Sequence, residues 1–424
     1  MQHQIVNWSD LCSEILSEIA NHLETRSDVY NFRQVCKNWR FSLSNIPQKL
    51  PYLSSLFPRR YLAVDSDFFA LLSRETHHHL VADAVYLLRP RNHQIYSKPW
   101  LITVEEFNRG KLSIRLPLSK IRAKGILPAN ENSPISLNLF DFDVNLIARG
   151  YSLRAPESDE TYSANGGLRF KNKLILFPIP VGFQPLTIDD YIGLLWFEDG
   201  LIAWLTLSGS LDWGFLGYKR TSKFDDIVNF KSKVYVVDHR GRIYVLNHDP
   251  EPTNGKNYKQ NLRLDCIVSD SFSSGCDTDR RNRLVDDSRD LYVVKRIVYC
   301  GDKIHFKVFK LDEENGKLEE IGSLEDDRIL FVGVEWCFFG SKADFPGCRG
   351  NCIFFTSDSF PVYGRGRLSK GVSDESYFRG TTKGLEFAVF HFADGNARPI
   401  TDFSGHSEFL WPPPACFCSA STLF

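Results

Sequence analysis

This sequence has no excess of charge of either sign, and that shortage excludes several kinds of partner. Among its 424 residues, Lys and Arg number 51 and Asp and Glu number 52. Proteins that coat nucleic acid or anionic membranes usually carry a net basic surface, because the partner is negatively charged. We therefore expect neither nucleic acid nor a membrane as a partner.

Long apolar runs are also absent. The most apolar region, Tyr191–Leu207, is interrupted by Glu198, Asp199 and Gly200, whereas a membrane span needs about 18 uninterrupted apolar residues. The first ten residues lack the basic flank and apolar core of a secretory signal. The ten cysteines are scattered along the chain, which is typical of reduced thiols. We expect a protein of the nucleus, the cytoplasm or both.

A short helical block is present at the start of the chain. Apolar residues recur at helical spacing in two stretches, so each stretch has one apolar face. Asp28 is a suitable N-cap for the second helix, and Pro47, Pro51 and Pro58 end the block. The apolar positions are Ile15, Leu16, Ile19, Ala20 and Leu23 in the first helix, and Val29, Phe32, Val35, Cys36, Trp39 and Leu43 in the second.

From about Tyr61 onward, short runs rich in β-branched and aromatic residues alternate with turn residues, which predicts an all-β domain. Hairpin turns are expected at 170–173, 238–241 and 392–395. A weak Lys-x-Lys repeat near Phe170 and Phe230 suggests a propeller, and an average blade of roughly 40–50 residues gives about six to eight blades. The expected strands include 168–177, 192–197, 201–207, 227–246, 291–299, 305–311, 329–334, 351–356 and 385–392.

The helical block carries an ordered motif, WSDLCSEILSEIANHLETRSDVYNFRQVCKNWR, from Trp8 to Arg40. This string resembles the F-box. Cys12 stands where the family has a proline that starts the first helix and touches the adaptor. The matching positions are Leu11, Glu14, Ile15, Leu16, Ile19, Leu23, Val35, Cys36, Lys37, Trp39 and Arg40.

The F-box resemblance implies a Skp-type adaptor as partner, and through it a cullin–RING ubiquitin ligase. The physical pattern agrees, because so small a helical pair cannot bury all of its apolar faces alone. Trp39 is a good anchor, since a large aromatic ring buries much area with little loss of rotamer freedom. The predicted adaptor-binding residues are Leu11, Cys12, Ile15, Leu16, Ile19, Leu23, Val35, Cys36 and Trp39.

The rest of the chain resembles plant-type F-box proteins with a kelch-like β-propeller. Three segments carry this likeness, at 226–247, 330–358 and 389–399. The implied fold is an α+β multidomain chain, with a small all-α F-box domain and linker at 1–57 and a large all-β propeller at 58–424.

Other residue groups favour ordinary structural roles. The adjacent side chains of His77, His78 and His79 point in different directions and rarely converge on one metal ion. Cys348 and Cys352, with Cys416 and Cys418, lack the common zinc spacing. The glycine–arginine run at 364–367 and the acidic runs at 189–190, 286–287 and 325–327 are expected in solvated turns. We expect no metal and no cofactor.

The leading hypothesis is therefore the substrate-recognition subunit of a Skp–cullin–F-box ubiquitin ligase, with no bond chemistry of its own and an unidentified target protein. Two alternatives stay open. The chain could be a binding or regulatory module that acts outside a ligase, or a propeller enzyme with two acids converging in a pocket.

Overall fold

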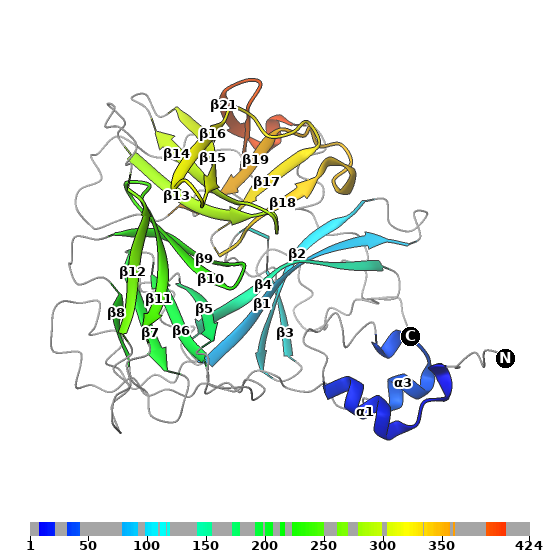
Figure 1. Ribbon diagram of the computed structural model, residues 1–424. Coiled ribbons are helices and arrows are strands. Elements are labelled where there is room, and N and C mark those ends of the chain that lie inside the picture. The colour runs from blue at the N-terminus through cyan, green and yellow to red at the C-terminus, as the bar shows by residue number, and fades with distance from the viewer. Residues whose placement is uncertain are drawn as a thin grey trace, which may run out of the picture.

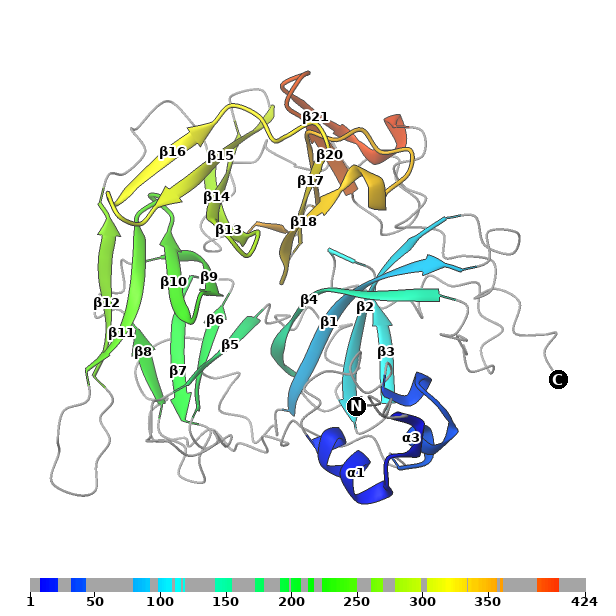
Figure 2. The ribbon, with the colours of Figure 1, turned by 45° about the vertical axis from the view of Figure 1, so that its right-hand side comes forward.

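The computed structural model describes residues 8–21, 32–42, 79–91, 98–108, 111–115, 117–118, 142–154, 172–178, 191–197, 200–206, 213–216, 223–249, 261–269, 279–298, 303–333, 335–356, 359–360 and 387–403. They form a small helical unit at the N-terminus and a ring of β-sheets (Figure 1). The helical unit lies outside the ring, beside the first strands, in both views (Figure 2). The predicted two-part α+β architecture is confirmed, while the predicted boundary at residues 57 and 58 lies outside the described residues.

The helical unit contains the short 3-10 helix η1 (Trp8–Asp10) and the α-helices α1 (Ser13–Asn21) and α3 (Lys37–Ser42), with helical residues also at 32–34. In α1 the apolar residues recur every three to four positions, so one side of the helix can pack inward. No described helix has both the length and the apolar character that a membrane crossing requires.

The strands form four hydrogen-bonded sheets, of which the largest has the order β3-β2-β1-β4-β5-β6-β7-β8. Its two halves are joined by a single residue pair, Tyr151 with Leu174. We therefore treat it as unit 1 (β1–β4) and unit 2 (β5–β8). Its strands are β1 (His79–Pro90), β2 (Trp100–Asn108), β3 (Lys111–Arg115), β4 (Phe142–Arg154), β5 (Asn172–Pro178), β6 (Tyr191–Phe197), β7 (Ile202–Thr206) and β8 (Trp213–Leu216).

Three further sheets complete the ring: unit 3 with order β12-β11-β10-β9, unit 4 with order β13-β14-β15-β16, and unit 5 with order β18-β17-β19-β20-β21. Unit 5 includes one parallel pair, β17 with β19. The strands are β9 (Phe224–Phe230), β10 (Lys233–Asp238), β11 (Ile243–Asp249), β12 (Asn261–Val268), β13 (Asp279–Asp286), β14 (Leu291–Val298), β15 (Ile304–Asp312), β16 (Lys317–Ile321), β17 (Arg328–Val332), β18 (Cys337–Ser341), β19 (Cys352–Thr356), β20 (Phe387–His391) and β21 (Asn396–Pro399).

Apolar layers between neighbouring units make the core. Separate clusters join units 2 and 3, units 3 and 4, and units 4 and 5, and a fourth cluster joins unit 5 back to unit 1. Both faces of a sheet are therefore covered, which explains why every residue of Leu291–Val298 is buried. The closed ring of sheets confirms the predicted propeller.

The described strands make five units. The expected count of six to eight blades stays a prediction, because segments such as 119–141 lie outside the described residues. The turn expected at 170–173 is wrong in its second half, since Asn172 and Lys173 belong to β5 and pair with Phe197 and Trp196. The expected turns at 238–241 and 392–395 are both confirmed.

Candidate functional site

The helical unit has a small apolar core of its own. Leu16, Ala20 and Phe32 are buried there. The rings of Phe32 and Trp39 lie 4.6 Å apart at an angle of 43°, so the helical residues at 32–34 and α3 are held together by an aromatic pair. Leu11, Ile19 and Trp39 pack against this core and are partly buried.

Two side chains of α3 tie the segment before α1 in place. The indole Nε1 of Trp39 donates a 2.9 Å hydrogen bond to the carbonyl of Trp8. The Asn38 amide donates to the carbonyls of Leu11, at 2.9 Å, and Ser9, at 3.3 Å. The 8–11 segment therefore lies across α3, although 27 to 31 residues separate the partners.

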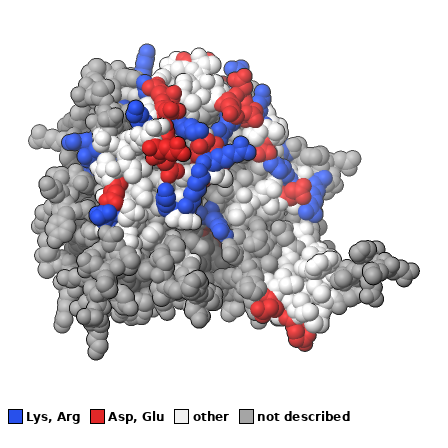
Figure 3. Space-filling model, viewed as in Figure 1, with Lys and Arg blue, Asp and Glu red and all other residues white. Residues whose placement is uncertain are grey.

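Outside this core, the helical unit exposes four large apolar side chains. Their exposed fractions are 63% for Trp8, 49% for Ile15, 50% for Val35 and 76% for Phe41. We call these four residues the apolar surface of the helical unit. Charged side chains of both signs crowd over units 4 and 5, whereas the helical unit shows mostly uncharged surface in the same view (Figure 3). In the propeller, among the described residues, only Phe215 is a comparably exposed large apolar side chain.

The predicted adaptor-binding residues divide into two groups. Ile15, Val35 and the thiol residue Cys12 are exposed and available to a partner. Leu16 is fully buried, so in the free chain it holds the unit together. Leu11, Ile19, Cys36 and Trp39 are intermediate, and Leu23 lies outside the described residues.

Trp8 and Phe41 were missed by the sequence reasoning, although they are the most exposed of the apolar side chains. Trp8 opens the motif string and Phe41 directly follows it, and neither is one of its matching positions. The available signal was an aromatic residue at each end of the helical block, which by itself is equally compatible with core packing.

Cys12 stands at the N-terminal boundary of α1, where its carbonyl accepts the first helical hydrogen bond, 3.1 Å from the amide of Leu16. The Glu14 carboxylate receives hydrogen bonds from its own amide, then from the side chains of Cys12 and Ser13, and these bonds lower its pKa. A negative charge in the first turn also suits the helix dipole. Cys12 therefore supports the start of α1 without being a proline.

In the propeller, ionised side chains of several units meet at the inner strands. The Asp226 carboxylate on β9 lies 3.0 Å from Lys173 Nζ on β5 and 3.5 Å from Arg283 Nη1 on β13. Burial alone raises the pKa of Asp226, but Arg283 and Lys173 outweigh it, so the pKa lies below its usual value. Arg283 also donates to the carbonyl of Gly333 in unit 5. The Asp226 carboxylate therefore links the sheets of units 2, 3 and 4.

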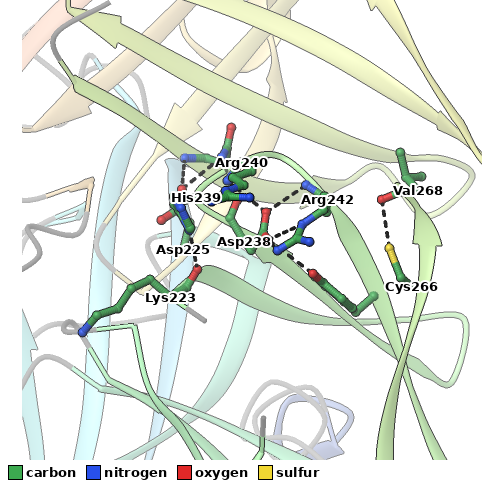
Figure 4. Close-up of polar contacts among 10 residues, drawn as sticks. Lys223, Asp225, Asp238, His239, Arg240, Arg242, Cys266 and Val268 are labelled. Carbon is green, nitrogen blue, oxygen red and sulfur yellow. Dashed lines mark hydrogen bonds and ion pairs between the residues drawn. The ribbon is translucent and has the colours of Figure 1, made fainter. Parts of the chain in front are cut away.

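The turn between β10 and β11 presents a second group of charges (Figure 4). The Asp238 carboxylate accepts 2.9 Å hydrogen bonds from the amides of Arg240 and Arg242, and pairs with the Arg242 guanidinium at 2.7 Å. Tyr244 also donates to it, at 3.3 Å. Gly241, with φ of 84°, allows the turn to close. Asp238 therefore sets the turn, while Arg240 is exposed at its tip.

The remaining sequence candidates have structural surroundings. Cys348 and Cys352 are buried free thiols, and burial raises both pKa values. Asp287 accepts hydrogen bonds from Tyr292 and Arg328, which links units 4 and 5. Within the described ranges no group of three or more His, Cys, Asp or Glu side chains is placed to hold a metal ion. The positions that lie outside the described residues are 77–78, 189–190, 364–367, 416 and 418.

Comparison with known proteins gives the same division of the chain. Residues 8–50 match the F-box domain and residues 68–382 match the KIB1-4 beta-propeller. The probable F-box protein At1g65740 of Arabidopsis thaliana is 27% identical over 95% of this chain and 97% of its own length. The F-box protein SKIP23 of the same plant is 23% identical, over 97% and 95%. The F-box/kelch-repeat protein At1g64840, also from Arabidopsis thaliana, is 24% identical, over 83% and 85%.

The propeller match spans most of the chain, the F-box match coincides with the helical unit, and both agree with the observed sheets and helices. The chain is therefore a plant-type F-box protein whose large C-terminal part belongs to the KIB1-4 β-propeller family.

Proposed function

We propose that this chain is the substrate-recognition subunit of a Skp–cullin–F-box ubiquitin ligase in the nucleus, the cytoplasm or both. The helical unit docks on the Skp-type adaptor, and the propeller holds a target protein. The chain carries out no bond chemistry; it raises the local concentration of the target beside the transferring enzyme.

One observation carries this proposal: the helical unit fills its own core and still exposes a large apolar surface. Leu16, Ala20 and Phe32 are buried, while Ile15 and Val35 are about half exposed. Four exposed large apolar side chains on so small a unit favour a protein-interaction role, because leaving them in water is unfavourable. F-box domains generally bind a Skp adaptor, and this surface offers the anchors for that contact.

The burial of the predicted adaptor-binding residues decides which of them should be mutated in a test of adaptor binding. Leu11 and Trp39 pack against the internal core, so truncating them would disturb the fold of the unit as well as binding. Ile15 and Val35 are better choices because half of each side chain is already in water. A control for the substitution on α1 is Ser17→Asp, which adds one of the two negative charges at another exposed position of the same helix.

The experiment is co-purification of the full-length chain with a Skp-type adaptor. We expect Ile15→Asp/Val35→Asp to weaken adaptor binding at least about tenfold, because two desolvated apolar anchors become charged. Ser17→Asp should bind as the unmutated chain does. Equal recovery of adaptor with the double variant, at unchanged helical circular dichroism, would overturn the docking surface.

A role outside a ligase is the second candidate, and Cys12 favours it because the family's adaptor-contacting proline is missing. The two roles differ in the events after adaptor binding. Recruitment of a cullin and turnover of a target support the ligase role. Adaptor binding without a cullin in the purified complex supports the module that acts alone.

A further inference from the structure

The ring of sheets has one boundary where neighbouring units are not consecutive in the chain. Units 1 to 5 follow one another in sequence, and unit 5 then returns to unit 1. The strands of unit 1 lie within 79–154 and those of unit 5 within 328–399, and among the described residues no strand is shared between them. We call this boundary the closing seam. Within the described ranges the seam is held by an apolar cluster, by the Arg89–Asp344 and Arg115–Glu335 ion pairs, and by a hydrogen bond from Thr356 to the carbonyl of Leu118.

Unit 1 places two carboxylates opposite each other at this seam. Asp83 on β1 and Glu105 on β2 are directly paired, and like charges at paired positions destabilise a sheet. Arg115 on β3 compensates, because its guanidinium lies 2.6 Å from Asp83 Oδ1 and 3.1 Å from Glu105 Oε2. All three side chains are buried.

A third carboxylate comes from the other side of the seam. Glu335 of unit 5 lies 3.4 Å from Arg115 Nη2 and is also buried. Burial works against the charge on Arg115, but Asp83, Glu335 and Glu105 outweigh it and raise the pKa of the guanidinium. A guanidinium can serve carboxylates on several sides because it has five donors in a rigid plane.

The apolar contacts at the seam are close and partly strained. Leu118 is buried with a φ of 63°, a left-handed conformation that is costly for a residue with a side chain. A Cβ at Gly333 would lie 2.9 Å from the Cα of Leu118, and a Cβ at Gly150 would lie 1.9 Å from the indole of Trp336. The two units therefore meet without spare space.

We propose that Arg115 keeps the closing seam shut by pairing with carboxylates of both units, and we call it the latch. We also propose that the propeller opens first at this seam, in a local step that leaves the other four interfaces between units closed. Chain continuity supports every interface except this one. When Arg115 leaves its place, the clustered carboxylates of both units repel each other. The left-handed Leu118 also relaxes on opening. The proposal is independent of how the helical unit binds an adaptor.

Hydrogen exchange of the full-length protein, followed by mass spectrometry of peptides, tests this. We expect the amides of β1, β2 and β17 to exchange by an opening at least about tenfold more frequent than that of β10 and β14, since local openings differ widely in free energy within one protein. Equal or greater protection of the seam strands would overturn the proposal.

Arg115→Lys tests the latch itself. The ammonium keeps the charge but loses the planar fork, so exchange should rise about tenfold on both sides of the seam, in β1–β2 and in β17. The matched control is Arg296→Lys, a buried arginine of β14 whose guanidinium lies 5.0 Å from the ring centroid of Phe360. The control should leave β1 and β2 within about twofold of the unmutated chain.

Three results would contradict the latch: a uniform rise in all five units, a rise confined to unit 1, or the same rise in β1 and β2 with Arg296→Lys. If Arg115→Lys yields no folded protein, Gly150→Ala decides, because it displaces Trp336 and leaves the charges unchanged. Faster exchange on both sides of the seam supports the proposal, and unchanged exchange overturns it.

Discussion

The indole Nε1 of Trp39 donates to the carbonyl of Trp8, 31 residues earlier, and so connects α3 to the beginning of the helical unit. The same ring packs 4.6 Å from Phe32. Trp39 therefore has two separable roles, one through its ring and one through its N–H group.

Replacing Trp39 tests these roles separately. Trp39→Phe keeps an aromatic ring, although a smaller one, and loses the hydrogen bond, so the helical unit should lose about 1–2 kcal/mol of stability. Trp39→Ala also leaves a cavity and should cost about 3–5 kcal/mol. Thermal circular dichroism of the helical signal measures both, and Phe41→Leu, an exposed change on the same helix, is the control. Equal losses for the two Trp39 variants would contradict the separation.

Cys12→Pro should strengthen adaptor binding. The amides of the first helical turn have no acceptor within the helix, so a proline at this boundary removes no helical hydrogen bond. Proline also restricts the unfolded chain, which stabilises the folded helical unit by about 0.4–1 kcal/mol. Where folding and binding are coupled, this corresponds to an affinity that is about two- to fivefold higher. Calorimetric titration with a Skp-type adaptor measures this, with Cys12→Ala as the control. Weaker binding of the proline variant would show that Cys12 has a role of its own.

Asp226→Asn should change how stability depends on pH. The pKa of Asp226 is lower in the folded protein than its ordinary 3.8, so its charge contributes stability above about pH 4 that is lost as the pH falls through the folded value. At neutral pH the variant should be less stable by about 3–5 kcal/mol, because Lys173 and Arg283 lose a buried partner. Urea unfolding at pH 7 and pH 3 should show this difference shrinking in acid. A constant difference would refute the assignment.

Gly350→Ala should be strongly destabilising, by more than about 3 kcal/mol. A Cβ at this position would lie 1.8 Å from the carbonyl oxygen of Asp326, and a backbone atom cannot rotate away. Gly322→Ala is the matched control, because a Cβ there meets nothing within 4 Å. Denaturant midpoints of the two variants measure the contrast, and similar midpoints would argue against this close approach.

The sequence was most informative where each strand carries its own apolar pattern. β19 is a continuous apolar run between turn residues, β14 is apolar except for Lys295 and Arg296, and both were predicted. β1 was missed, and a buried acid, Asp83, stands among its apolar residues. Asp83 is accommodated in this strand because it pairs with Arg115 on β3, and no local sequence pattern can show that pairing.

The candidate site shows a similar limit. Helical periodicity places Ile15 and Leu16 on one broad apolar side of α1, yet Leu16 is buried and Ile15 is half exposed. Which of two neighbouring positions faces inward depends on where α3 and Phe32 pack. That is a property of the folded unit, so the motif identified the right helix but not which of its residues are free for a partner.

The carboxylate of Asp226, held by Lys173 and Arg283, has a consequence for the target binding proposed above. It uses the inner strands of units 2, 3 and 4 for mutual support, and Arg283 adds a bond to unit 5. A target-contacting surface built on those strands could not change without weakening the whole scaffold. On the function proposed above, a target would therefore be bound away from these strands, where substitutions leave the Asp226 contacts intact.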